Sequence, residues 1–276
     1  MGRIFEALQR SSAKIESSGS VTSEPAASAE ILGNLDSDTV DLDRARPLAV
    51  SAAPEHRLVI LTGQRSLGAE KIRILAARLR QLQDQRLLKT LLITSTVKDE
   101  GKTVLSANVA LALAKTRQRV LFIDGDFHQA NATRLLGANG SPGLTDWWRS
   151  EGAIEKYLMK VKGLPLWLLP AGGPVEQPLE MLQSGRLLDQ VNKISGSFDW
   201  IIIDSPPSAP LADASVWGKL ADGILLVTRE GKTPKRLLRK VLDSLDNKKL
   251  LGIVLNNCSD PDQRHYTQYY NLPNKH

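Results

Sequence analysis

The feature that most constrains the fold is a series of short, unbroken apolar runs separated by segments with helical periodicity. From Leu58 onward these runs read LVILT, TLLIT, RVLFID, LWLLPA, WIIID, GILLVT and GIVLN. Strands that are apolar on both faces occur where helices cover both sides of a parallel sheet. Helical periodicity falls between the runs, near residues 68–86, 102–116, 177–194, 211–221 and 234–247. The sequence therefore predicts an α/β domain with a mostly parallel central sheet and helices on both faces.

The composition of the chain changes along its length and predicts four parts. Residues 1–10 place Ile4, Phe5 and Leu8 on one side of a short amphipathic segment, and residues 11–54 are rich in Ser, Ala, Pro and Asp, as in a flexible linker. We expect the folded domain to occupy residues 55–257. The polar residues 258–276 predict a mobile tail, because they have no apolar face to bury.

Several classes of protein are excluded at this level. The chain has no apolar run long enough to span a membrane, its first ten residues lack the apolar core of a signal peptide, and Glu6 replaces the Ser or Thr of a myristoylation signal. These features predict a cytoplasmic protein. The chain has one cysteine, Cys258, and four histidines, so any metal is expected to be held by oxygen. A net charge of +6 selects no particular partner.

A phosphate-binding loop is predicted where the apolar run LLITS meets an Ala-rich helical segment at Gly101, Lys102 and Thr103. Such a loop turns its backbone N–H groups toward phosphates, with a lysine as mobile cation and a hydroxyl as ligand for Mg²⁺. The residues expected to bind nucleotide here are Thr96, Val97, Lys98, Asp99, Glu100, Gly101, Lys102, Thr103 and Val104. A surface turn that happens to contain Gly-Lys-Thr is the alternative.

Two positions in this loop differ from the usual pattern. Thr96 stands where glycine is common, five residues before Gly101, and Asp99 occupies another position that often carries glycine. Aspartate tolerates a left-handed backbone better than most residues, so we expect the loop to close. The Asp99 carboxylate beside the phosphates is expected to weaken nucleotide affinity.

Acidic residues follow two other apolar runs. Asp124 and Asp126 come at the end of RVLFID, and Asp204 ends WIIID, which has the form of a Walker B strand. Ligands of open α/β sheets bind at the carboxyl ends of the strands, and carboxylates there suit Mg²⁺. The alternative is a set of solvated acids at strand ends.

The chain resembles the bacterial tyrosine kinases of capsule and exopolysaccharide synthesis, which are relatives of the MinD/ParA ATPases. The resemblance covers roughly residues 58–258 and rests on EGKT at 100–103, DGD at 124–126, GLTD at 143–146, IIIDSPP at 201–207 and GIVLNN at 252–257. It implies a P-loop NTPase fold of the MinD/ParA type that binds ATP and Mg²⁺.

The resemblance also implies roles for individual residues. Lys102 would contact the phosphates and Asp124 would accept the proton of a tyrosine hydroxyl. Thr103 and Asp126 would hold Mg²⁺, with Asp204 supporting the metal shell. Asn256 would contact adenine, or it is simply a polar strand end.

The chain departs from the family in two places that bear on activity and assembly. His128 stands where the family usually has arginine after the acidic pair. The Glu-x-x-Arg-x-x-Arg pattern associated with ring assembly keeps Glu70 and Arg73, but Ala76 replaces its second arginine. A homo-oligomer is therefore an open expectation.

Three of the four tyrosines lie within the last eleven residues, at Tyr266, Tyr269 and Tyr270. This concentration in a polar segment predicts either exposed phosphoacceptors or aromatic anchors for docking. The resemblance favours phosphoacceptors.

Three functions remain under consideration. The first is an ATP-dependent tyrosine autokinase that regulates exopolysaccharide or capsule synthesis and export. It would be recruited to the inner face of the cell membrane by a membrane-embedded co-polymerase or activator with a cytosolic segment. The second is a MinD/ParA-like ATPase switch whose basic segment contacts DNA or lipid through Lys235, Arg236, Arg239 and Lys240, although nucleic acid is the less favoured partner. The alternative for these four residues is a solvated helix face, which is the commoner role of such a run. The third is a degenerate nucleotide-binding scaffold, suggested by Asp99, His128 and Ala76.

Overall fold

The central sheet has eight strands in the order β1-β4-β5-β3-β6-β2-β7-β8. A computed structural model describes residues 42–63, 66–209 and 213–258, all within one compact unit. The strands are β1 (Arg46–Leu48), β2 (Thr90–Ser95), β3 (Val120–Asp124), β4 (Met159–Val161), β5 (Leu166–Leu169), β6 (Trp200–Asp204), β7 (Gly223–Arg229) and β8 (Leu250–Asn256). All neighbouring strands run parallel except β4 and β5. The predicted mostly parallel sheet is confirmed.

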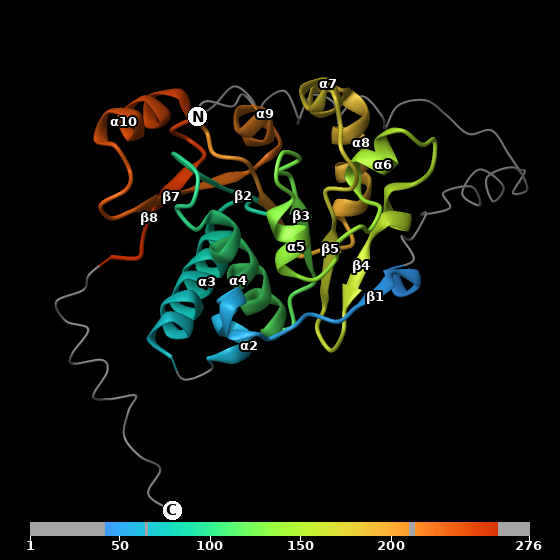
Figure 1. Ribbon diagram of the computed structural model, residues 1–276, viewed down its shortest axis with the longest axis horizontal. Coiled ribbons are helices and arrows are strands. Elements are labelled where there is room, and N and C mark those ends of the chain that lie inside the picture. The colour runs from blue at the N-terminus through green and yellow to red at the C-terminus, as the bar shows by residue number, and fades with distance from the viewer. Residues whose placement is uncertain (1–41, 64–65, 210–212, 259–276) are drawn as a thin grey trace, which may run out of the picture. The chain divides into compact units, whose positions relative to one another are not determined.

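Helices cover both faces of this sheet (Figure 1). One core contains residues of α2 (Val59–Thr62), α3 (Leu67–Gln85), α4 (Lys102–Lys115) and α5 (Asn131–Leu135). The other contains residues of α6 (Leu144–Trp148), α7 (Pro178–Gln183), α8 (Gly185–Ser195), α9 (Asp213–Leu220) and α10 (Lys235–Ser244). Short 3-10 turns lie at η1 (Leu42–Arg44), η2 (Pro54–His56) and η3 (Ile154–Tyr157).

The strands alternate their side chains between the two cores, as the pleat of a strand requires. In β3, Phe122 packs in the core of α2–α5, whereas Leu121 and Ile123 pack in the other core. In β6, Ile202 packs in the core of α2–α5, whereas Ile201 and Ile203 pack in the other core. Both faces of these strands are buried, which is why their sequences are apolar without interruption.

Two of the elements differ from the sequence-based expectation. The run LVILT forms the short helix α2 instead of a strand, because a four- or five-residue apolar run does not distinguish a buried strand from a buried helical turn. The expected helix over 177–194 divides into α7 and α8 at Ser184, whose backbone is extended with φ −68° and ψ 135°.

The predicted domain boundaries also need revision at one end. Residues 42–54 were expected in the linker, but β1 pairs in register with β4, and Leu42 and Leu48 are buried. The amphipathic segment 1–10 and nearly all of the tail, from residue 259, lie outside the described residues. None of the helices in the described part of the chain is long and apolar enough to span a bilayer.

Candidate functional site

The phosphate loop lies between β2 and α4, as predicted. Two of its residues have a left-handed backbone, Asp99 with φ 61° and Gly101 with φ 92°. A Cβ at Gly101 would lie 2.1 Å from Nδ2 of Asn256, so only glycine fits at this position. Asp99 adopts the conformation that glycine usually supplies, which agrees with the tolerance expected of aspartate.

Glu100 connects the phosphate loop to the turn after β7 and to the end of β8. Its side chain is fully buried, and Oε2 accepts a hydrogen bond from the N–H of Val97 at 2.9 Å. The hydroxyl of Thr233, in the turn between β7 and α10, donates to Oε1. The carbonyl oxygen of Glu100 accepts from Nδ2 of Asn256 at 2.8 Å. The loop is therefore held from three directions.

Lys102 forms a buried ion pair with Asp126, with 3.1 Å between Nζ and Oδ2. Its ammonium also lies 3.5 Å from the hydroxyl oxygen of Thr103. Lys102 and Asp126 are 7% and 2% exposed. The lysine, the hydroxyl and the carboxylate expected around a phosphate and its metal are thus brought together by α4 and the end of β3.

Asp204 and Asp124 stand opposite each other at the ends of β6 and β3, where the two strands pair in register. Burial raises the pKa of Asp204 to about 7, with Lys102 opposing the shift. Oδ1 of Asp204 accepts from the hydroxyl of Ser106 at 3.1 Å, and Oδ2 is buried with no hydrogen-bond partner among the described residues. An unpartnered buried carboxylate oxygen of this kind suits a metal shell with its water.

Asp124 is fully buried and already engaged. Its Oδ2 accepts from both the N–H and the hydroxyl of Thr133, each at 2.7 Å, and Oδ1 has a longer contact of 3.3 Å from the N–H of Asp126. Burial raises the pKa of Asp124 to about 6, although the Thr133 hydrogen bonds oppose it. Its carboxylate therefore retains protons at a higher pH than an ordinary aspartate.

The glycine between the two acids has its own constraint. A Cβ at Gly125 would lie 2.7 Å from Nε1 of Trp217, and that indole N–H donates to the carbonyl oxygen of Gly125 at 3.2 Å. Close packing against α9 thus requires the glycine of DGD and fixes the backbone that carries both aspartates.

The residues present fit Mg²⁺ bound together with a nucleotide. In the described part of the chain, no three His, Cys, Asp or Glu side chains form a ready-made metal cluster. Mg²⁺ does not need one, because it is usually held by one or two carboxylates with phosphate oxygens and water. Thr103, Asp126 and Asp204 offer that limited set of oxygen atoms.

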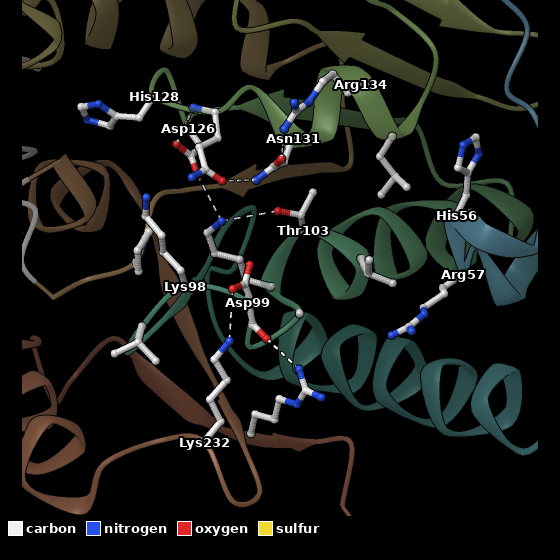
Figure 2. A pocket seen from close by; sticks show the side chains of 18 of the residues that line it. His56, Arg57, Lys98, Asp99, Thr103, Asp126, His128, Asn131, Arg134 and Lys232 are labelled. Carbon is white, nitrogen blue, oxygen red and sulfur yellow. Dashed lines mark hydrogen bonds and ion pairs between the residues drawn. The ribbon is translucent and has the colours of Figure 1, made fainter.

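A cavity of about 1090 Å³ opens over the phosphate loop (Figure 2). The predicted residues that line it are Val97, Lys98, Asp99, Gly101, Lys102, Thr103, Val104 and Asp126. Those that do not line it are Thr96, Glu100, Asp124, Asp204 and Asn256. In this structure Asn256 contacts the loop itself, and it donates to the Glu100 carbonyl.

Sequence reasoning missed other residues of the cavity lining. They are His56, Arg57, Gln129, Asn131, Arg134, Leu135, Pro207, Ala209, Arg229 and Lys232. Arg229 and Lys232 could have been found, since they end and follow a buried strand at the edge where ligands bind. No local pattern marks Arg57, which directly follows η2, or Arg134, which lies in α5.

In the Glu-x-x-Arg-x-x-Arg pattern linked to ring assembly, the position of the second arginine is occupied by Ala76, which is buried in this structure. Glu70 and Arg73 form an ion pair at 3.0 Å on the surface of α3, whereas Ala76 is 4% exposed and packs in the core. An arginine in the same orientation would have to be buried. Position 76 therefore does not offer a surface cation in this chain.

Comparison with known proteins agrees with this geometry. A family model described as an AAA domain matches residues 98–229. The tyrosine-protein kinase CpsD of Streptococcus agalactiae serotype Ia is 30% identical over 62% of this chain and 75% of its own length. The succinoglycan biosynthesis transport protein ExoP of Rhizobium meliloti is 31% identical over 76% of this chain, but the match covers only 28% of ExoP. The kinase domain of the Escherichia coli tyrosine kinase ETK shares the fold, with a TM-score of 0.69 and 21% identity over 77% of this chain and 89% of that domain.

The fold and the phosphate loop define the class: a P-loop NTPase with a sheet of the MinD/ParA type, as predicted. Within that class, the chain belongs to the family of bacterial tyrosine-protein kinases that includes CpsD.

Proposed function

We propose that the chain is an ATP- and Mg²⁺-dependent tyrosine autokinase that phosphorylates its own C-terminal tyrosines. The observation that supports this most directly is the convergence of Lys102, Thr103, Asp126 and Asp204 beneath the cavity. One buried oxygen of Asp204 has no hydrogen-bond partner among the described residues. The acceptors Tyr266, Tyr269 and Tyr270 lie outside the described residues. Their clustering in the sequence and the family supply this part of the proposal.

In the proposed reaction, Lys102 exchanges its ion pair with Asp126 for contact with the phosphates. Thr103, Asp126 and Asp204 would hold Mg²⁺, which neutralises the negative charge that shifts onto ADP as it leaves. The tyrosine oxygen forms a bond to the γ-phosphorus while the bond from that phosphorus to the β,γ-bridging oxygen breaks.

The proton of the tyrosine hydroxyl passes to Asp124. Oδ1 is the oxygen available for it, because both strong hydrogen bonds from Thr133 go to Oδ2. The raised pKa of Asp124, about 6, makes this carboxylate a better proton acceptor than an ordinary aspartate. Positioning and charge neutralisation supply most of the catalysis in such transfers.

The names of the relatives support the proposed cellular role. CpsD is named a tyrosine-protein kinase and ExoP a succinoglycan transport protein. We propose that this chain regulates exopolysaccharide or capsule synthesis and export. It would be recruited to the inner face of the membrane by a membrane-embedded co-polymerase with a cytosolic segment. A homo-oligomer would let one subunit phosphorylate another.

The test is phosphotyrosine on the full chain produced in bacteria and mapped by mass spectrometry. We expect phosphate on Tyr266, Tyr269 or Tyr270, and its loss in Lys102→Met. The measurement is repeated with the cytosolic segment of a co-polymerase partner present. Wild-type protein that hydrolyses ATP without acquiring phosphotyrosine in either condition would contradict an autokinase.

That outcome would instead support the ATPase switch. One observation favours it as the second candidate: Lys235, Arg236, Arg239 and Lys240 are all exposed on α10. Such a basic face is suited to an anionic surface. Protein that neither hydrolyses ATP nor phosphorylates tyrosine would support the nucleotide-binding scaffold.

A further inference from the structure

One end of the cavity is lined by residues that do not belong to the phosphate loop. At about 1090 Å³ the cavity is at the upper limit of ordinary small-ligand sites, which hold roughly 300–1000 Å³. Figure 2 shows Lys98 and Lys232 on one side, and His56 and Arg57 on the opposite side beyond Thr103. We call this second end the basic lobe and define it by the lining residues His56, Arg57, Val104, Arg134 and Leu135.

The backbone of the segment that carries Arg57, at the edge of the basic lobe, is held by a buried residue of the domain core. Arg57 has a left-handed backbone, with φ 53°, which is uncommon for a residue other than glycine. Its carbonyl oxygen accepts from Nδ2 of Asn108 at 3.0 Å, and Oδ1 of Asn108 accepts from the N–H of Ile60 at 3.1 Å. Asn108 is 2% exposed. A buried side chain of α4 therefore holds the segment that presents Arg57.

The lobe also carries positive charge that the nearby carboxylates do not balance. Among the described residues, the lysines and arginines that line the cavity are Arg57, Lys98, Lys102, Arg134, Arg229 and Lys232, and the acids are Asp99 and Asp126. Both acids are paired at the phosphate-loop end, Asp126 with Lys102 and Asp99 with Lys232, each at 3.1 Å. Neither Arg57 nor Arg134 forms an ion pair with a described carboxylate, and Arg134 donates to Oδ1 of Asn131.

The lobe combines two kinds of surface. Its arginine side chains suit an anion that accepts several hydrogen bonds, and arginine forms paired hydrogen bonds to phosphate oxygens. Val104 and Leu135, both half-buried, offer an apolar surface between the cations. Together these features fit an aromatic ring that carries a phosphate.

We propose that the basic lobe binds a phosphotyrosine of the C-terminal cluster while a second tyrosine of the same tail occupies the phosphate-transfer site. The proposal rests on the autokinase function proposed above. Tyr269 and Tyr270 are three and four residues from Tyr266, so the chain between them spans at most about 14 Å when extended. One phosphorylated tyrosine held in the lobe would keep the next within reach, and one tail would acquire several phosphates in succession.

Binding to the lobe can be measured without any phosphoryl transfer. The full chain with all three tail tyrosines changed to Phe is saturated with Mg²⁺ and ADP, which occupy the phosphate loop. It is then titrated with a peptide of residues 259–276 that carries phosphotyrosine at position 266. We expect at least tenfold tighter binding than for the same peptide without phosphate. Inorganic phosphate at the same concentration should not displace it, because it lacks the ring.

Single variants locate this binding. Arg57→Gln and Arg134→Gln should each weaken binding of the phosphopeptide at least fivefold. The matched control is Arg117→Gln, since Arg117 is also an exposed arginine with a left-handed backbone, but follows the far end of α4. Equal binding by all three variants, or displacement by inorganic phosphate alone, would overturn the proposal. So would binding that disappears when ADP is present, because the peptide would then occupy the phosphate loop.

A second measurement follows the natural tail. In wild-type protein that autophosphorylates, Arg57→Gln and Arg134→Gln should lower the ratio of multiply to singly phosphorylated chains, whereas Arg117→Gln should not. An unchanged ratio would contradict the proposal. If the wild type acquires no phosphotyrosine, the autokinase proposal fails, and the peptide titration still decides whether the lobe binds phosphotyrosine.

Discussion

At the scale of single residues, Asp99 is where this chain departs most from an ordinary phosphate loop. Its backbone takes the left-handed conformation that glycine adopts freely. Its carboxylate forms an ion pair with Lys232 at 3.1 Å, and its side chain is 79% exposed. An exposed pair of this kind contributes little to stability. The effect of Asp99 is therefore expected mainly in nucleotide binding.

We predict that Asp99→Gly tightens ATP binding about three- to tenfold. The substitution removes a negative charge beside the phosphates and frees Lys232 to contact them. The dissociation constant for Mg²⁺·ATP, measured by calorimetric titration, checks this. Asp99→Asn separates the two causes, because asparagine removes the charge and still tolerates the left-handed backbone. Unchanged or weaker affinity in Asp99→Gly would contradict the prediction.

At the scale of elements, the site is a junction of a loop, a turn and a strand end. The turn after β7 meets the phosphate loop through Thr233, whose hydroxyl accepts from the N–H of Arg229 at 2.8 Å and donates to Glu100. The end of β8 meets the same loop through Asn256. The conformation of the phosphate loop thus depends on elements more than a hundred residues away in the chain.

We predict that Thr233→Val weakens nucleotide binding about tenfold. Valine keeps the shape of threonine but leaves the buried carboxylate of Glu100 without one donor, and such losses cost roughly 1–3 kcal/mol. Thr233→Ser, which retains the hydroxyl, should restore affinity, as measured by ATP titration.

The matched control for this substitution is Thr228→Val, at a buried threonine of β7 whose hydroxyl contacts the Val254 carbonyl instead. It should leave affinity near the wild-type value. In Glu100→Gln the Thr233→Val change should cost less than in wild type, because the charged acceptor is already gone. Full additivity of the two substitutions would argue against the contact.

At the scale of the whole molecule, two buried carboxyl groups of the site make the stability of the fold depend on pH. Asp124 and Asp204 have pKa values raised from 3.8 to about 6 and about 7, chiefly by burial. Between about pH 4 and pH 7 the folded chain keeps protons on these carboxyls that the unfolded chain has released. Stability therefore falls as pH rises through this range.

We predict that the unfolding free energy of the nucleotide-free protein decreases from pH 5 to pH 8, and that the decrease is smaller in Asp204→Asn. Each carboxyl contributes at most about 1.4 kcal/mol per pH unit. Denaturant unfolding across this range measures the slope. Asp189→Asn, an exposed aspartate of α8, serves as control and should keep the wild-type slope. The same slope in Asp204→Asn as in wild type would refute the linkage.

Much of this protein was determined by the sequence alone. The apolar runs predicted seven strands and six of them are correct, because strands buried on both faces need an unbroken apolar run. The phosphate loop was recognisable because its backbone conformation, cation and hydroxyl come from consecutive residues. The short strands β1 and β4 escaped notice, since three residues carry too little periodicity to identify.

Only the tertiary structure decided how these parts meet. The order of the strands brings Thr233 and Asn256 to Glu100, places Thr133 on Asp124, and buries Ala76 where the family pattern has an arginine. The same packing brings Arg57 and Arg134 from separate elements to one cavity. Contacts between residues that are distant in the sequence depend on the packing of the whole domain, and no local sequence pattern predicts them.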